Sequence, residues 1–395
     1  MIPVLTTTRR ATKPAGALGR WLTGAALFGV TAGLALLLAR VTGSLPHVLS
    51  AYDEWQEHAY HHIPQFLRWV LGDTTEAQFY KSALGGLGLL AGGWIAHAGW
   101  RRGRRWAGFA VSGGSGLWPW VTAAALLGLL LSNLAWGWMI PATGAWQPTF
   151  VAFVSVPPMV VLTYGAGWRV AVTGAVLGAA LTTPAALLLV NLVCVPLGQP
   201  AVLGSVTAMW VSALIAFPLC RRLPWLPRPV PPPAAERTVP RQGPAWVVRR
   251  VLADFTEAPF HGNEIASLGL LAGTVLTYLL NPLTPVYGSG LLPALLTAQV
   301  LTATLGVLVY RRQWARHGWY PTFVPVVSVA PAVLLTYGPT WPAVLSGAVL
   351  GALAAPPLAA FASRRIPLGV HPCAGNTFAM TVCTGVLVPL LDIVL

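Results

Sequence analysis

The sequence has 395 residues, of which only 9% are charged and 55% are hydrophobic, and its mean hydropathy is +0.67. Soluble domains carry about 25% charged residues, so this composition excludes an ordinary water-soluble protein. The contents of 41 Gly, 35 Pro and 18 Trp are typical of membrane helices and their interfaces. The net charge of +14 does not indicate a nucleic-acid partner, because the basic residues form short clusters between apolar stretches.

Eleven apolar stretches approach the length of about 20 residues that crosses a bilayer as a helix. A β-barrel would need shorter, alternating strands, which these runs exclude. Arg9 and Arg10 precede the first stretch, which we interpret as a membrane helix and not as a cleaved twin-arginine signal. The stretches lie at 20–40, 82–99, 115–140, 149–165, 168–190, 203–220, 264–281, 290–310, 322–338, 341–362 and 374–395. The predicted fold is an all-α integral membrane protein of about eleven transmembrane segments.

Some of these segments are candidates for half-helices or re-entrant segments. Pro157 and Pro158 interrupt one run, and the residues from His371 to Asn376 interrupt another. A polar stretch between Ser44 and Lys81 predicts an interfacial amphipathic helix.

The chain contains an internal repeat. A 34-residue segment starting at Trp146 aligns without a gap onto the segment starting at Trp319, with 21 identities. Downstream of this segment, LGQPAVLGSVTAM at Leu197 matches LGVHPCAGNTFAM at Leu368. Upstream of it, four residues have identical counterparts 181 positions later: Asp73, Thr75, Glu76 and Phe79 match Asp254, Thr256, Glu257 and Phe260. The predicted organisation is therefore an N-terminal helix and external loop (1–65), a first unit (66–220), a cytoplasmic Pro- and Arg-rich linker (221–246) and a second unit (247–395).

Each unit holds five hydrophobic segments, so the second unit should enter the membrane from the side opposite to the first. Charge supports this inversion, because short cytoplasmic loops collect Lys and Arg. Arg101, Arg102, Arg104 and Arg105 lie in a loop whose counterpart, NPLTPVYGSG, is uncharged. With a cytoplasmic N-terminus and an external C-terminus, 21 of 24 basic residues face the cytoplasm, and Arg40, Arg68 and Lys81 do not. We expect a multi-pass protein of the bacterial cytoplasmic (inner) membrane.

The shared W-x-P-T-F-V-x-x-V-S-V-x-P motif is the strongest candidate for a solute pathway. A proline in a first helical turn leaves the next N–H groups free for a solute, and a later proline exposes a carbonyl one turn before it. The alternative is that these residues only kink and anchor packed helices. The candidate residues are Trp146, Pro148, Thr149, Phe150, Ser155 and Tyr164, with Trp319, Pro321, Thr322, Phe323, Ser328 and Tyr337.

The end of each unit supplies a second candidate. HPCAGNTFAM places His371, Asn376 and Thr377 in an apolar run, where an unsatisfied polar group costs several kcal/mol. Such groups either pair with a neighbouring helix or face water. The first unit has Ser205 and Val206 in place of Asn376 and Thr377. For His371, a position in an interfacial loop is an equal alternative.

A third candidate is a histidine cluster in the external loop. Glu54, His58, His61 and His62 would share one helix face, a geometry compatible with zinc. The second unit has no counterpart, and our prediction is that the protein holds no metal and no cofactor.

Function follows from the architecture and from one absence. No Asp or Glu lies well inside a hydrophobic segment, whereas coupled carriers commonly keep a buried carboxylate. We therefore expect a channel or facilitative transporter for a small polar solute, neutral or anionic, with its site between the inverted repeats. Alternatives are an ion-coupled secondary transporter and a metal-dependent membrane enzyme that uses the histidines. No enzyme site can be assembled, so we predict no enzymatic activity.

The W-x-PTFV and LTYG elements with HPCAGNTFAM resemble an uncharacterised bacterial family of duplicated polytopic membrane proteins, which implies no activity. The plan of five plus five inverted segments resembles urea transporters, which pass a small neutral solute and are usually homotrimers, although their signature sequence is absent here. HPCAG is similar to the HPP motif of small membrane proteins linked to nitrite transport, but the rest of that pattern is missing. The expected partners are the lipid bilayer, a small-molecule solute and further copies of the chain, as a trimer or dimer.

Overall fold

The computed structural model describes residues 16–229, 242–393 and 395, and within these ranges the chain forms helices and no strands. Arg9 and Arg10, and the linker residues 230–241, lie outside the described residues. All eleven predicted hydrophobic segments contain helix. In the described part of the chain, seven helices are long and apolar enough to cross a membrane: Ala17–Ser44, Trp118–Trp136, Trp168–Cys194, Ala201–Arg222, Leu292–Val309, Trp341–Arg365 and Cys373–Leu391. The protein is thus an all-helical chain with the character of a multi-pass membrane protein.

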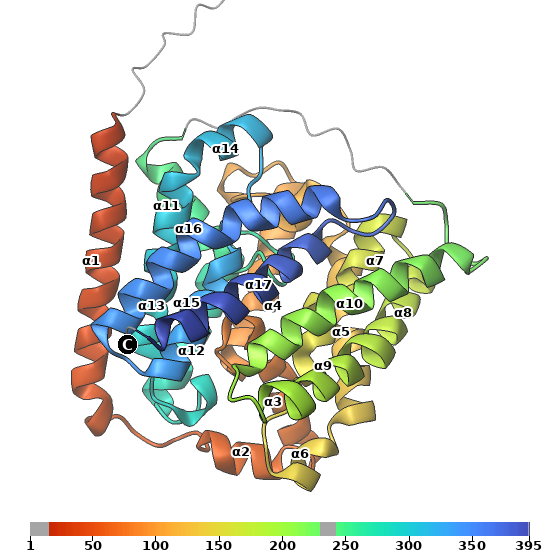
Figure 1. Cartoon of the computed structure of the whole chain (residues 1–395), viewed down its shortest axis with the longest axis horizontal. Helices are drawn as coiled ribbons and strands as arrows, with labels where there is room; N and C mark the ends of the chain where they lie inside the picture. The colour runs from red at the N-terminus through yellow and green to blue at the C-terminus, as the bar shows by residue number, and fades with distance from the viewer. Residues whose placement is uncertain (1–15, 230–241, 394) are drawn as a thin grey trace, which may run out of the picture.

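Helix α1 (Ala17–Val41) stands at one edge of the molecule and packs along α13 (Leu292–Val309) (Figure 1). Gly24 allows this approach, because a Cβ there would meet the side chains of Thr304 and Leu308 at 2.8 Å. Most other α1 side chains are exposed and apolar, as in a helix that faces lipid.

The remaining helices of the N-terminal part gather on the side of the molecule away from α1 (Figure 1). The polar stretch after α1 forms a short helix, α2, before the first unit begins. The elements are α2 (Tyr52–His58), α3 (Ile63–Asp73), α4 (Ala83–Arg101), α5 (Trp118–Trp136), α6 (Met139–Thr143), α7 (Val156–Tyr164), α8 (Trp168–Leu177), α9 (Thr183–Leu189) and α10 (Ala201–Arg222).

The C-terminal part lies between these helices and α1 (Figure 1). Its elements are α11 (Pro244–Asp254), α12 (Glu264–Leu280), α13, α14 (Arg311–His317), α15 (Val329–Tyr337), α16 (Trp341–Arg365) and α17 (Cys373–Leu391). Besides the packing of α1 on α13, the helix pairs α4 with α12 and α10 with α17 join the N-terminal and C-terminal parts.

Glycines make the α4–α12 contact unusually close. A Cβ on Gly88 would collide with the carbonyl of Gly269, and a Cβ on Gly269 would collide with the carbonyl of Gly88. Such backbone-to-backbone contact requires small residues, as is common where helices cross in a membrane. The crossing fixes the positions of the segments that precede α4 and α12, where the buried charges lie.

Candidate functional site

Three charged side chains are fully buried at the junction of α3 and α4. Asp73 ends α3, Glu76 lies in a short 3₁₀ turn (Glu76–Gln78), and Lys81 precedes α4. The Lys81 Nζ donates a hydrogen bond to Asp73 and lies 3.7 Å from Glu76 Oε1, and each side chain is at most 1% exposed. We call Asp73, Glu76 and Lys81 the first acidic cluster.

Neighbouring donors hold the carboxylates of the first acidic cluster. Asp73 Oδ2 accepts hydrogen bonds from Asn133 Nδ2 at 2.8 Å and from the Thr149 hydroxyl at 2.9 Å. Tyr60 in turn donates to Asn133 Oδ1 at 2.6 Å. Trp146 Nε1 donates to Glu76 Oε1 at 2.9 Å. Hydrogen bonds and ion pairs therefore connect Tyr60, in the segment between α2 and α3, through the cluster to Trp146.

A second cluster occupies the end of α11. Arg250 Nη2 donates to Asp254 Oδ1 at 2.9 Å and to Glu257 Oε1 at 3.1 Å. Trp319 Nε1 donates to Glu257 Oε1 at 3.0 Å, as Trp146 does to Glu76. Asp254 is fully buried, whereas the Glu257 side chain is 16% exposed. We call Arg250, Asp254 and Glu257 the second acidic cluster.

The same local geometry holds both clusters. Ser82 and Asn263 cap α4 and α12, and each donates its backbone N–H to the hydroxyl of a threonine seven residues earlier, Thr75 or Thr256. Phe79 (φ 66°) and Phe260 (φ 61°) both adopt the left-handed conformation that bulky residues rarely take. Two identical strained turns at matched positions indicate a constrained local structure.

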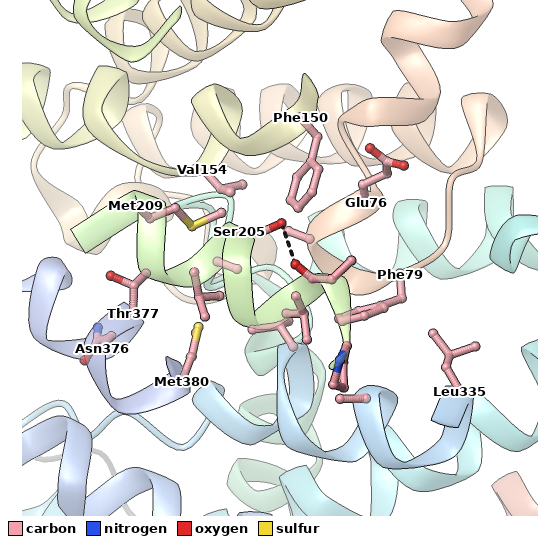
Figure 2. A pocket seen from close by; sticks show the side chains of 18 of the residues that line it. Glu76, Phe79, Phe150, Val154, Ser205, Met209, Leu335, Asn376, Thr377 and Met380 are labelled. Atoms are coloured by element: carbon pink, nitrogen blue, oxygen red, sulfur yellow. Dashed lines mark hydrogen bonds between the residues drawn. The ribbon is translucent and has the colours of Figure 1, made fainter. Parts of the chain in front are cut away.

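A cavity of about 360 Å³ lies beside the first acidic cluster (Figure 2). We call it the central cavity. Its walls are mainly aliphatic and aromatic, with Asn376 and Thr377 on one side and Glu76 on the other (Figure 2). The lining residues from the first unit are Glu76, Ala77, Phe79, Trp146, Phe150, Val154, Pro200, Ala201, Val202, Ser205, Val206 and Met209; those from the second unit are Ala258, Tyr287, Phe323, Val327, Ala332, Leu335, Thr336, Cys373, Asn376, Thr377 and Met380.

Five of the residues that the sequence singled out line this cavity: Trp146, Phe150, Phe323, Asn376 and Thr377. Two others belong to the acidic clusters, since Thr149 donates to Asp73 and Trp319 to Glu257. The others are outside the lining: Pro148, Ser155, Tyr164, Pro321, Thr322, Ser328, Tyr337 and His371.

Several of those outside the cavity pack or bond elsewhere. Tyr164 stacks on Phe217 with ring centroids 6.3 Å apart, and the Tyr337 hydroxyl donates to the Val388 carbonyl at 2.7 Å. For Tyr164 and Tyr337 these contacts are those of packed helices, the alternative that the sequence left open.

The two motif segments are discontinuous helices. A 3₁₀ turn (Thr149–Val154) and α7 meet at Ser155, whose backbone is not helical (φ −129°, ψ −117°), and Ser328 breaks the matching segment (φ −144°, ψ −84°). Pro157 thus lies in the first turn of a helix. The N–H of Thr149, which we expected to be free, donates to the Gln147 carbonyl at 2.9 Å.

The loop before α17 holds His371 between two long helices. Its Nδ1 accepts a hydrogen bond from the Cys373 N–H at 3.2 Å. Loss of water around the ring lowers the pKa of His371 to about 4, which keeps the imidazole neutral and able to accept this bond. The His371 side chain therefore acts at the start of α17 and not in the cavity.

The external histidines do not converge. His58 and His61 are in edge-to-face contact, 5.7 Å between ring centroids, and His58 Nδ1 is bonded to the Glu54 carbonyl at 2.8 Å. Among the residues that the structure describes, no group of three His, Cys, Asp or Glu side chains could hold a metal ion.

The acidic clusters are the feature that sequence reasoning missed. Glu76, Asp254 and their partners lie in polar stretches of the sequence between hydrophobic segments, and the fold buries them. The sequence did contain one signal. The chain has only ten acidic residues, and four of them form two corresponding pairs, Asp73 with Asp254 and Glu76 with Glu257.

No protein-family model matches this chain, and no curated protein matches it.

Proposed function

We propose that the chain is a duplicated membrane protein of one plus five plus five transmembrane segments. The element bounds support this, because α11 begins and ends 181 residues after α3 (63 to 244 and 73 to 254), and α15 begins and ends 173 residues after α7 (156 to 329 and 164 to 337). Helices of equal length at corresponding positions are expected of two copies of one fold.

The contacts between α4 and α12 support a pseudo-two-fold relation between the units. Gly88 and Gly269, which differ by 181, lie against each other. A Cβ on Gly92 would meet the Ile265 carbonyl, and a Cβ on Gly273 the Leu84 carbonyl; these residues also correspond with an offset of 181. Reciprocal contacts of this kind are the signature of a two-fold interface. With an odd number of segments per unit, they favour inverted repeats.

Orientation follows from this proposal and can be tested directly. In a variant without the native cysteines, Gly144→Cys and His317→Cys place thiols at corresponding exposed positions of the two units. A membrane-impermeant maleimide should label Gly144→Cys from outside the cell and His317→Cys only after the membrane is opened. Labelling of both from one side would contradict the inversion and the cytoplasmic N-terminus.

We propose that the protein transports a small solute through the central cavity. One observation carries this proposal: corresponding residues of both units line the cavity, including Ala77 with Ala258 and Phe150 with Phe323. Solute sites of inverted-repeat transporters lie at the interface of the repeats, often beside discontinuous helices like those broken at Ser155. Inner-membrane location and a trimeric or dimeric assembly belong to the same proposal.

The walls of the cavity favour one chemical class of solute. Aromatic and aliphatic groups dominate, and among the described lining residues Glu76 is the one Asp, Glu, Lys or Arg. An anion would lose its hydration without gaining a cationic partner in the lining. The favoured solute is a neutral molecule with an apolar part and one or two hydrogen-bonding groups, which Asn376 and Thr377 could bind.

A second candidate is an ion-coupled secondary transporter. The absence of buried carboxylates was the reason to expect an uncoupled pathway, but Asp73, Glu76 and Asp254 are buried in the fold. Ionisable groups buried in a membrane protein are costly and commonly mark ion or proton pathways. A metal-dependent enzyme has less support, because the external histidines do not converge.

Flux measurements on reconstituted protein test the transport proposal. Stopped-flow light scattering of proteoliposomes with urea, glycerol and 1,4-butanediol should show faster entry of at least one solute than empty liposomes do. Met209→Trp fills the cavity wall and should abolish this excess, whereas Leu192→Trp, at a residue 69% exposed on the helix surface, should preserve it. Flux equal to that of empty liposomes, with no thermal stabilisation by any of the three solutes, would argue against the proposal.

A further inference from the structure

Each acidic cluster holds one more negative charge than positive. In the first, Asp73 and Glu76 face the single ammonium of Lys81. In the second, Asp254 and Glu257 share the single guanidinium of Arg250, because the nearby Arg249 is paired with Glu264 at 2.6 Å. An uncompensated charge in a dry interior is costly, and such a group usually binds a proton or a counter-ion instead.

Each cluster also has one carboxylate oxygen with no hydrogen-bond partner. Among the described residues, the buried carboxylate oxygens in this state are Glu76 Oε2 and Asp254 Oδ2, and both residues are at least 98% buried. The Glu76 carboxyl lies beside that of Asp73, and the Asp254 carboxyl lies beside that of Glu257 and the Thr322 hydroxyl, which is itself unpartnered. One excess charge and one unpartnered oxygen therefore occur at each site.

The other titratable groups around the clusters do not cancel this charge. Tyr52, Tyr60 and Tyr287 surround the first cluster, and phenols are neutral at neutral pH. In the second cluster, Cys373 faces Glu257, and a thiol cannot supply a positive charge. A metal cation needs several converging oxygen ligands, and no suitable group of acidic side chains is present in the described parts of the chain.

We propose that each acidic cluster is a proton-binding site, with the proton on Glu76 in the first unit and on Asp254 in the second. Binding is the transfer of a proton from a hydronium ion to the carboxylate, which releases a water molecule and leaves each cluster with one positive and one negative charge. A role of these protons in solute movement rests on the proposed transport function, since Glu76 lines the central cavity.

The two protons should differ in their access to water. Tyr52 and Tyr287 are in contact over the first cluster, with ring centroids 5.7 Å apart, and Tyr287 also packs on Trp146 at 6.1 Å. In the second cluster Glu257 is partly exposed, and its partner Trp319 is 43% exposed. We expect the second proton to exchange with solvent and the first to be occluded.

Infrared spectroscopy of the purified protein tests this inference without any transported solute. At neutral pH the wild-type protein should show the carbonyl stretch of protonated, buried carboxyl groups. Glu76→Gln and Asp254→Asn should each remove a distinct part of that band, and the double variant should remove both parts. Glu54→Gln, at an exposed acidic residue of the external loop, is the matched control and should leave the band unchanged. In D₂O the part assigned to Asp254 should shift first.

Two results would overturn the inference. The first is a wild-type spectrum without protonated carboxyl bands at neutral pH, which requires no variant to fold. The second is a band that survives in the folded double variant. Loss of flux in proteoliposomes together with intact bands would instead contradict the transport proposal alone.

Discussion

The two acidic clusters have corresponding carboxylates but cations from different positions. Lys81 neutralises the first cluster, and its counterpart in the second unit, with an offset of 181, is Gly262. Arg250 neutralises the second cluster, and its counterpart in the first unit is Trp69. One cation per carboxylate pair is therefore common to both units, while the position that supplies it differs.

The backbone conformation explains why the position of Lys81 in the first unit can hold a glycine, Gly262, in the second. Lys81 (φ 45°) and Gly262 (φ 56°) both have left-handed backbones, which glycine adopts without cost and lysine does not. Each cation also lies over an aromatic ring: Lys81 Nζ is 3.4 Å from the centroid of Trp69, and the Arg250 guanidinium is 4.7 Å from that of Trp314. A strained lysine is retained in the first unit because the carboxylates need its charge.

The largest expected effect comes from removing the cations. Lys81→Met leaves the buried carboxyl groups of Asp73 and Glu76 without a cation and should lower the free energy of unfolding by about 3–5 kcal/mol. Arg250→Met should cost less, about 2 kcal/mol, because Glu257 can still be hydrated. Both losses should shrink as pH falls, since protonation neutralises the carboxylates that remain. Denaturation in detergent, followed by tryptophan fluorescence at several pH values, measures this difference. Equal losses in both variants would show that sealing of the first cluster has no energetic effect.

Transplanting the cation is a sharper test of the same comparison. Lys81→Gly relieves the left-handed strain but removes the charge, and Trp69→Arg with Lys81→Gly recreates the pattern of the second unit. The double variant should recover about 1–2 kcal/mol relative to Lys81→Gly, the range of a hydrogen bond to a charged group. Trp69→Leu with Lys81→Gly is the control without charge. If the arginine and leucine variants unfold at the same temperature, charge compensation is not what links these positions.

Removal of the indole donors Trp146 and Trp319 should reveal the difference in solvent exposure between the two clusters. Trp146→Phe leaves a buried carboxylate oxygen of Glu76 short of a partner, which should cost about 1–3 kcal/mol. Trp319→Phe, at an exposed residue, should cost about 0.5 kcal/mol because water can replace the donor. Thermal unfolding of the two variants in the same detergent compares them. A greater loss for Trp319→Phe would reverse the assignment of sealed and open clusters.

The hydrophobic segments could be predicted from the sequence because their signal is local. Continuous apolar runs mark helices such as α5 and α13 to within a few residues. The break at Ser155 was located near Pro157 and Pro158, although the prolines begin α7 and do not interrupt it. The motif also indicated Phe150 and Phe323 on the cavity wall.

The acidic clusters could not be predicted in the same way, because burial there depends on contacts distant in sequence. Asp73 lies in a polar stretch, and its partners Asn133 and Thr149 come from other helices. Tyr287 covers Trp146 from the second unit, at a position where the loop sequence shows no apolar run. No periodicity in the sequence encodes such convergence.

The smallest expected effect is that of Thr322→Val, and the corresponding substitution in the first unit, Thr149→Val, provides its comparison. The Thr149 hydroxyl donates to Asp73 at 2.9 Å, so Thr149→Val should cost about 2 kcal/mol, as for a lost hydrogen bond to a charged group. The Thr322 hydroxyl is buried beside Asp254 without a well-formed bond, so Thr322→Val should change stability by less than about 0.5 kcal/mol. Valine preserves the shape of threonine in both cases, and chemical denaturation of the two variants provides the comparison. A loss for Thr322→Val as large as that for Thr149→Val would mean that Thr322 donates to Asp254 in solution, and that the second cluster has no unpartnered oxygen to hold a proton.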